Sequence, residues 1–206
     1  MTFIKGDKCE LRVLEESDDE AKIWTKFVMH SSEHMKFVMT GSQPMRWFDI
    51  RDEWKREREK GAVLFGVWAP SEAGSCGECH MAFPSTDLSK HTHHRFIGTC
   101  GLYNPYEIYH RWEARFMIVD PEAVGKGVGL EVAKMLTKYG FDKLNAHKIW
   151  LGVNADNLVA YKCYLSAGYR VEGTLREDLY VNGKYVDAVR MAVLKDEWRK
   201  NESSAS

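Results

Sequence analysis

Apolar positions along the chain recur with two different spacings. Apolar and polar residues alternate from Gly6 to Leu14, which predicts a strand, and similar or continuous apolar runs predict six more at 63–69, 96–103, 112–119, 148–153, 169–176 and 185–194. Apolar residues three or four positions apart predict helices within 17–28, 46–60, 132–139 and 158–167. The last two strands are joined by Asn182-Gly183, a turn typical of hairpins.

Two segments fall outside this pattern. The polar connection 70–95 separates the second and third predicted strands and is expected to be a long insertion within a hairpin. The tail 201–206 is short and polar and is predicted to be disordered. A chain of 206 residues is long enough for one domain with a sizeable core and too short for two, so residues 1–200 are predicted to form a single domain.

A glycine-rich loop stands between a strand and a helix in the stretch 119–140. Gly125, Gly127 and Gly129 follow the predicted strand, and an amphipathic helix follows them. Such a loop lets several backbone N–H groups point into one space, and the helix adds its positive dipole end, so a phosphate or diphosphate would fit. Plain turns share this glycine spacing, and neither the Walker pattern nor the dinucleotide fingerprint is matched.

Composition narrows the classes of partner. An apolar fraction of 44% is that of a globular protein rather than a disordered one. A formal net charge of -1 gives no electrostatic reason to expect a nucleic acid or a membrane as partner. We see no signal peptide and no apolar run of membrane-spanning length, so a cytoplasmic location is expected.

Cysteine and histidine residues gather in the 70–95 connection. Cys76 and Cys79 form a Cys-x-x-Cys pair, and His91 and His93 follow at loop distance, a set from which a tetrahedral structural zinc site can be built. The alternative is a polar loop without metal, because the histidine spacing does not match the usual finger pattern. Covalent haem attachment at Cys-x-x-Cys-His is discounted because no export signal is present.

The glycine loop carries a resemblance to a known family. Asp-Pro-Glu followed by Gly-Lys-Gly-Val-Gly and a helix resembles the acetyl-CoA loop of the GNAT superfamily of N-acetyltransferases, whose signature is Arg/Gln-x-x-Gly-x-Gly/Ala. Gly127 and Gly129 fill the last two signature positions. Val124 stands where the family usually has Arg or Gln, a difference that affects one side-chain contact to the cofactor but not the backbone cradle.

A second stretch extends the resemblance. Asn157 to Tyr169 is similar to the other GNAT signature, Asn-x-x-Ala-x-x-x-Tyr-x-x-x-Gly-Phe/Tyr, with each position filled. The ending from Glu172 to Trp198 is similar to that of the subgroup containing the ribosomal-protein N-terminal acetyltransferases and the amino-sugar acetyltransferases. The two motifs and the ending cover about the last half of the chain, whereas residues 1–95 match only in element order.

The resemblance implies an α/β (α+β) fold. Its sheet would be mixed and mostly antiparallel, with seven strands, flanking helices and a central parallel pair that splays apart to admit the pantetheine arm. A splayed pair leaves backbone groups unpaired, which is costly unless a ligand satisfies them. We therefore expect main-chain contacts to the arm from Met117, Ile118 and Val119.

Site residues follow from the same resemblance. The diphosphate would be held at Gly125, Lys126, Gly127, Val128 and Gly129, and Asn157 would bond the pantetheine or the neighbouring backbone. Tyr164 is the candidate acid for the departing thiolate, since a tyrosine is a proton donor at neutral pH. Glu113 is the candidate base. The structural alternatives are a core aromatic for Tyr164 and an ion-paired strand carboxylate for Glu113.

The predicted activity is transfer of an acetyl group from acetyl-CoA to a primary amine by direct attack. The amine would belong to a small molecule, with an amino-sugar nucleotide ahead, or to a protein N-terminus, and the enzyme would be a monomer or homodimer. One alternative is a non-catalytic acyl-CoA-binding module. It stays possible because Val124 departs from the signature and the base is not identified by the sequence. A weaker alternative is a zinc-stapled interaction protein that uses the 70–95 loop.

Overall fold

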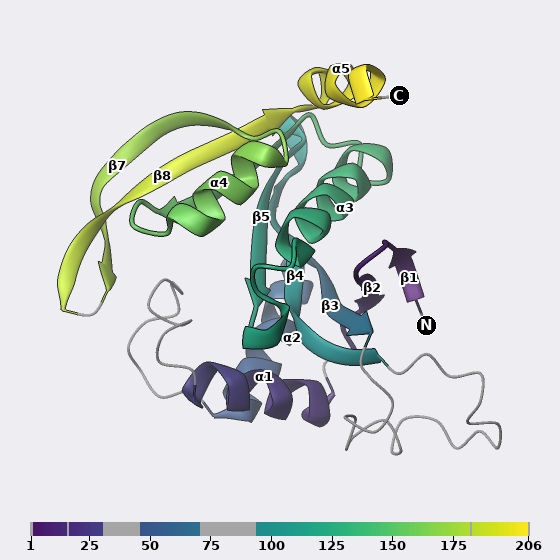
Figure 1. The fold of residues 1–206 in the computed structure, drawn as a ribbon, viewed down its shortest axis with the longest axis vertical. Helices are drawn as coiled ribbons and strands as arrows, with labels where there is room; N and C mark the ends of the chain where they lie inside the picture. Colours follow the sequence, from purple (N-terminus) through teal and green to yellow (C-terminus); the bar gives the residue numbers. More distant parts are fainter. Residues whose placement is uncertain (1, 16, 31–45, 71–93, 182, 206) are drawn as a thin grey trace.

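One mixed sheet organises the chain. The computed structural model describes residues 2–15, 17–30, 46–70, 94–181 and 183–205. In these ranges eight strands pair into a single sheet: β1 (Thr2–Lys5), β2 (Glu10–Val13), β3 (Val63–Pro70), β4 (His94–Tyr106), β5 (Arg111–Ile118), β6 (Lys148–Asn154), β7 (Arg170–Val181) and β8 (Lys184–Leu194). The helices are α1 (Asp18–His30), α2 (Trp47–Glu59), α3 (Val128–Asp142), α4 (Leu158–Ser166) and α5 (Lys195–Ala205), with short 3-10 helices η4 (Glu107–Tyr109) and η5 (Pro121–Ala123) (Figure 1).

The strand order across the sheet is β1-β2-β3-β4-β5-β6-β8-β7. All neighbours are antiparallel except β5 and β6, which are parallel. The predicted mixed, mostly antiparallel fold is therefore confirmed, with eight strands instead of seven. The difference arises at the N-terminus, where the strand predicted over 6–14 is a turn closed by the Gly6 N–H to the Cys9 carbonyl, followed by β2 and preceded by β1.

The parallel pair separates after a short junction. β5 and β6 are paired only at the start of each strand, by the three registers Arg111↔Lys148, Trp112↔Ile149 and Glu113↔Trp150. β5 stays paired with β4 as far as Ile118, and β6 stays paired with β8 as far as Asn154. Among the described residues the facing edges of 114–118 and 151–154 are thus left without a strand partner, which confirms the expected splay.

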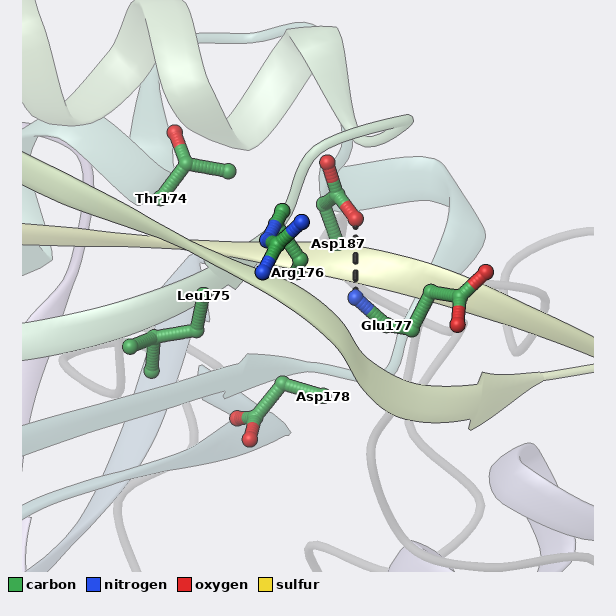
Figure 2. A pocket seen from close by; sticks show the side chains of 6 residues that line it. All are labelled: Thr174, Leu175, Arg176, Glu177, Asp178 and Asp187. Atoms are coloured by element: carbon green, nitrogen blue, oxygen red, sulfur yellow. Dashed lines mark hydrogen bonds between the residues drawn. The ribbon is translucent and has the colours of Figure 1, made fainter.

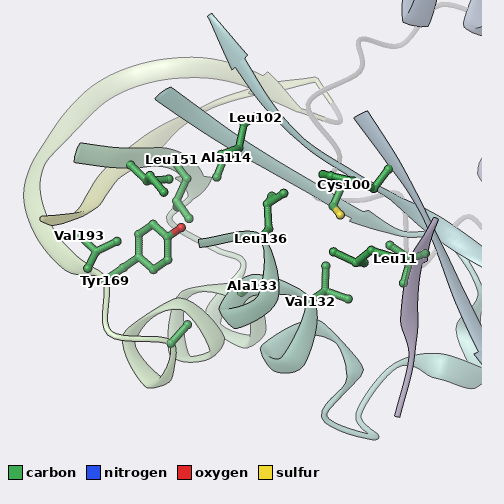
Figure 3. Close-up of a cluster of buried hydrophobic side chains, with 14 of the residues drawn as sticks. Leu11, Cys100, Leu102, Ala114, Val132, Ala133, Leu136, Leu151, Tyr169 and Val193 are labelled. Atoms are coloured by element: carbon green, nitrogen blue, oxygen red, sulfur yellow. The ribbon is translucent and has the colours of Figure 1, made fainter. Parts of the chain in front are cut away.

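Two apolar clusters pack on opposite faces of the sheet. Successive strand residues point to opposite faces, so Phe65 joins the larger cluster and Leu64 the smaller one. The larger cluster lies under α3, whose Val132 and Leu136 are fully buried in it (Figure 3). The smaller cluster joins α1 and α2 to the other face through residues that include Trp24, Ile50 and Trp54. Because helices cover both faces of the sheet, the sheet can support the ends of β5 and β6.

A buried hydroxyl pair ties the last strands to α3. Thr137 and Tyr169 are almost fully buried, and their hydroxyl oxygens lie 2.7 Å apart. Because a buried hydroxyl that loses its partner pays its desolvation cost, Thr137→Val and Tyr169→Phe should each lower the free energy of unfolding by about 1–3 kcal/mol. The double variant should lose less than the sum of the two, as measured by urea denaturation. Strict additivity would show that the hydroxyls do not interact.

The C-terminal segment differs from the prediction. Residues 201–206 are predicted to be disordered, but α5 continues to Ala205. Trp198, only 7% exposed, anchors the helix in the larger cluster, and Lys138 Nζ on α3 lies 3.2 Å from Glu202 Oε1. The polarity of the tail concealed this docking because the apolar anchor lies before the segment.

Candidate active site

The glycine loop joins η5 to α3 at the end of β5. Gly125 and Gly127 have φ values of 76° and 80°, in the left-handed region, where a side chain would be strained. Gly127 is the N-cap of α3, so the free N–H groups of the first helical turn begin here. The structure thus brings the predicted residues 125–129 together at a helix start, as an anion site requires.

Charged groups fix the entry to this loop. Asp120, only 2% exposed, accepts a hydrogen bond from the Glu122 N–H at 2.8 Å. Arg95 Nη2 lies 3.0 Å from Asp120 Oδ2, and Arg95 Nη1 lies 2.6 Å from Glu122 Oε2. The hydrogen bond and charge of Arg95 lower the pKa of the Glu122 carboxyl. Arg95 therefore compensates the charge of both carboxylates, which reduces their repulsion of an anion at the loop.

The N-terminal turn is a further support that sequence reasoning missed. The Glu131 carboxylate on α3 accepts hydrogen bonds from the N–H groups of Asp7, Lys8 and Cys9 at 2.7, 2.9 and 3.0 Å. These partners are 122 to 124 positions apart in the sequence. No local motif signals such a contact, because a single glutamate in a helix is usually solvated.

Tyr164 on α4 reaches the open part of the slot. Its ring centroid lies 5.6 Å from that of Phe116, on the part of β5 that has left β6. Burial raises the pKa of the Tyr164 phenol above its ordinary value near 10, so the group keeps its proton. No described residue hydrogen-bonds its hydroxyl. Phe116, which the sequence prediction did not include, therefore helps to place Tyr164 beside the slot.

Glu113 lies at the closed end of the slot, in the last register shared by β5 and β6. Its carboxylate accepts from Arg115 Nε at 2.8 Å and from Asn104 Nδ2 at 2.5 Å. Glu113 and Phe116 are three positions apart, so their side chains point to opposite faces of β5. The structure therefore does not place the candidate base and Tyr164 on one face; they lie on the two sides of the strand.

The other predicted cofactor contacts surround the slot. Met117 and Ile118 lie on the unpaired edge of β5, whereas the Val119 N–H donates to the Ile97 carbonyl at 2.9 Å and is already used. Asn157 is the N-cap of α4, and its Oδ1 accepts from the Ala160 N–H at 3.1 Å. The Asn157 side chain thus orients the helix that carries Tyr164, and no residue in the described ranges accepts a hydrogen bond from its Nδ2 group.

The metal prediction falls on a different part of the chain. Cys76, Cys79, His91 and His93 lie outside the described residues. Within the ranges the structure describes, no group of three or more His, Cys, Asp or Glu side chains is arranged to hold a metal ion. In the same ranges, no helix is long and apolar enough to cross a membrane.

A hollow also lies on the β7–β8 hairpin. The hairpin curves out from the sheet (Figure 1), and positions 170–178 are all exposed. Glu177 donates its N–H to Asp187 Oδ1 at 2.8 Å where β7 bulges (Figure 2). The hollow is lined by Thr174, Leu175, Arg176, Glu177, Asp178 and Asp187. None of the predicted acid, base or cofactor residues contributes to it.

The site combines a glycine loop, a split parallel pair and a tyrosine beside the split. Comparisons with known proteins agree with this arrangement. The family model of the acetyltransferase (GNAT) domain matches residues 8–170. The chain belongs to the GNAT acetyltransferase family. This GNAT match includes the glycine loop and Tyr164. It also includes the helices α1 and α2, which carry no GNAT signature motif.

Curated GNAT relatives match about half of the chain. Spermidine N(1)-acetyltransferase of Escherichia coli (strain K12) is 36% identical over 120 residues, which cover 53% of this chain and 64% of the relative. The putative ribosomal N-acetyltransferase YdaF of Bacillus subtilis (strain 168) is 29% identical over 101 residues, which cover 49% of this chain and 55% of the relative. The chain therefore spans less than two thirds of the length of these relatives.

A solved GNAT structure covers more of the chain. Spermidine N-acetyltransferase from Vibrio cholerae, crystallised in complex with CoA and spermine, has a TM-score of 0.73 at 22% identity and covers 94% of this chain and 99% of its own. At this identity the likeness shows the fold alone. The slot described above is thus part of a GNAT fold, while the roles of the individual residues remain predictions.

Proposed function

We propose that this GNAT protein is an N-acetyltransferase that moves the acetyl group of acetyl-CoA directly to a primary amine. The observation that carries the proposal is the slot: β5 and β6 part after three registers, with the glycine loop at the end of β5 and Tyr164 beside the opening. The unpaired edges of the slot can bond the amides of pantetheine as a surrogate strand. The loop and helix start suit its diphosphate.

The two faces of β5 suit the two proton transfers. In the proposed reaction the neutral amine nitrogen attacks the thioester carbonyl carbon, and the carbon–sulfur bond then breaks. Glu113, on one face, takes the proton from the nitrogen directly or through water, while Tyr164, on the other, donates its proton to the departing sulfur. The thioester would lie between them in the slot. No covalent enzyme intermediate is needed.

A small-molecule amine is the favoured acceptor class. Relatives with the names spermidine N(1)-acetyltransferase and putative ribosomal N-acetyltransferase support an amine acceptor of either small or protein type. The higher identity to the spermidine enzyme favours an aliphatic amine over both an amino-sugar nucleotide and a protein N-terminus. Thiol release from acetyl-CoA across a panel of polyamines, amino sugars and peptides would test the activity. Absence of amine-dependent release with every acceptor would contradict it.

Substitution of Glu113 gives the activity a further test. If its carboxylate accepts the amine proton, Glu113→Gln should lower kcat about tenfold or more. Glu59 is an exposed carboxylate at the end of α2, and Glu59→Gln is therefore the matched control. An unchanged kcat in Glu113→Gln would assign Glu113 to the structural ion pair with Arg115 instead.

A non-catalytic acyl-CoA-binding module is the second candidate. Two observations favour it: Val124, 38% exposed, gives the loop no polar side chain, and the Glu113 carboxylate already has two partners. A module of this kind would be stabilised against thermal unfolding by CoA without any turnover. Thermal melts with CoA, run beside the thiol-release panel, separate the two functions.

A further inference from the structure

The turn between β1 and β2 is held against the start of α3. Glu131 lies in the first turn of α3, and its carboxylate accepts three backbone N–H groups of the turn, from Asp7 to Cys9. The Cys9 thiol adds a fourth contact, with Sγ 3.3 Å from Glu131 Oε2. Four donors on one carboxylate fix the turn relative to the helix, because each charge-assisted bond must break before it can move.

This turn directs the Lys8 side chain onto the glycine loop. The Lys8 ammonium donates to the Lys126 carbonyl at 2.9 Å. It also lies directly over the next residue: a Cβ added to Gly127 would be 2.6 Å from Lys8 Nζ. The charge therefore contacts the loop backbone at the left-handed glycine that begins α3. Glycine at 127 thus makes room for the ammonium as well as for the turn.

The loop lacks the polar side chain that the family signature supplies at its first position. Val124 occupies the Arg or Gln position of the GNAT signature, and its side chain is apolar and 38% exposed. Lys126 offers a charge from the loop itself, on an exposed side chain. A diphosphate carries two negative charges, and ammonium groups a few ångströms away favour it by Coulomb attraction. Lys8 is held at two points, its backbone N–H by Glu131 and its ammonium by the Lys126 carbonyl, so its charge is already in place before a ligand arrives.

We propose that Lys8 is a binding residue for the diphosphate of CoA and provides the contact that Val124 cannot make, with Glu131 as its positioning residue. The inference rests on the proposed function, since it requires CoA at the glycine loop. The bond to the Lys126 carbonyl leaves two of the three ammonium protons for phosphate oxygens. Lys8 thus adds a cation from the N-terminal turn to the backbone cradle of residues 125–129.

Calorimetric titration with CoA tests this role. Lys8→Met should weaken CoA binding about five- to tenfold, because a charge-assisted contact is lost, and the loss should shrink as the salt concentration rises. Lys8→Arg should bind CoA nearly as well as the wild type. Lys134→Met removes the same charge from an exposed position farther along α3 and should leave the affinity unchanged. Inorganic pyrophosphate as a second probe should show the same order of affinities.

Each outcome decides between a ligand contact and a structural latch. Equal CoA affinity in wild type and Lys8→Met overturns the inference, and so does an equal weakening in Lys8→Met and Lys8→Arg or a loss that does not depend on salt. In Lys8→Met, the substitution Val124→Arg should restore affinity by returning the family's cation to the loop. If the wild-type chain takes up no CoA at all, the proposed function itself fails, which is a different result from normal uptake by both wild type and Lys8→Met.

Discussion

Replacing Tyr164 by phenylalanine should lower kcat for acetyl transfer by about 100-fold or more, the typical contribution of a positioned acid. The KM for acetyl-CoA should change little, because the ring keeps its contact with Phe116 and only the hydroxyl is lost. Steady-state thiol release at saturating amine measures both constants. An unchanged kcat would remove Tyr164 from the chemistry and leave it as a core aromatic.

A matched variant and a pH profile sharpen this result. Tyr161→Phe changes another half-buried tyrosine of α4 and should leave kcat near the wild-type value. Burial raises the pKa of Tyr164 above its ordinary value near 10, so its protonated form persists through neutral and mildly alkaline pH. The wild-type rate should therefore show no alkaline loss from Tyr164 below about pH 10. A limb at lower pH that disappears in Tyr164→Phe would contradict the assigned direction.

The substitution Gly98→Ala should cause the largest loss of stability. A Cβ on Gly98 would lie 2.1 Å from the Met117 carbonyl oxygen and 2.9 Å from Ile118 Cα, both backbone atoms of the paired strand β5. Backbone cannot rotate aside as a side chain can, so we expect a loss of about 3 kcal/mol or more, at the upper end of overpacking costs. Since small domains are stable by about 5–15 kcal/mol, such a loss removes a large part of the total.

Urea denaturation of Gly98→Ala beside Gly152→Ala isolates this effect. Gly152 on β6 is exposed, and a Cβ built on it meets no atom within 4 Å. Gly152→Ala should therefore be neutral or slightly stabilising, since alanine loses less chain entropy on folding. A midpoint for Gly98→Ala equal to that of Gly152→Ala would show that β4 and β5 can move apart without cost.

The sequence predicted those parts of the site that depend on local sequence patterns. Gly125, Gly127 and Gly129 are read from their spacing, and the helix that carries Tyr164 is read from its cap and periodicity. These features depend on residues within about one turn of each other, so the chain around them is sufficient. The same is true of β3, β4 and β5, whose apolar runs are buried in any sheet that contains them.

Contacts between distant segments could not be predicted in this way. The bonds from the N-terminal turn to Glu131 and the ion pair of Arg95 with Asp120 join residues that only the finished sheet brings together. The bond from Asn104 to Glu113 is a further case, because only the pairing of β4 with β5 brings these two residues together. Single charged residues have no periodicity that reveals their partners.

The short junction of β5 with β6 has a mechanical consequence. The strands β1 to β5 are cross-linked along their lengths, and so are β6, β8 and β7, but the two groups share only three registers. The β5–β6 border has fewer registers than the borders β2–β3, β3–β4, β4–β5, β6–β8 and β7–β8, so a change of angle between the two groups would break fewer strand pairings there. A molecule bonded to both free edges would therefore hold the two groups of strands at a single angle.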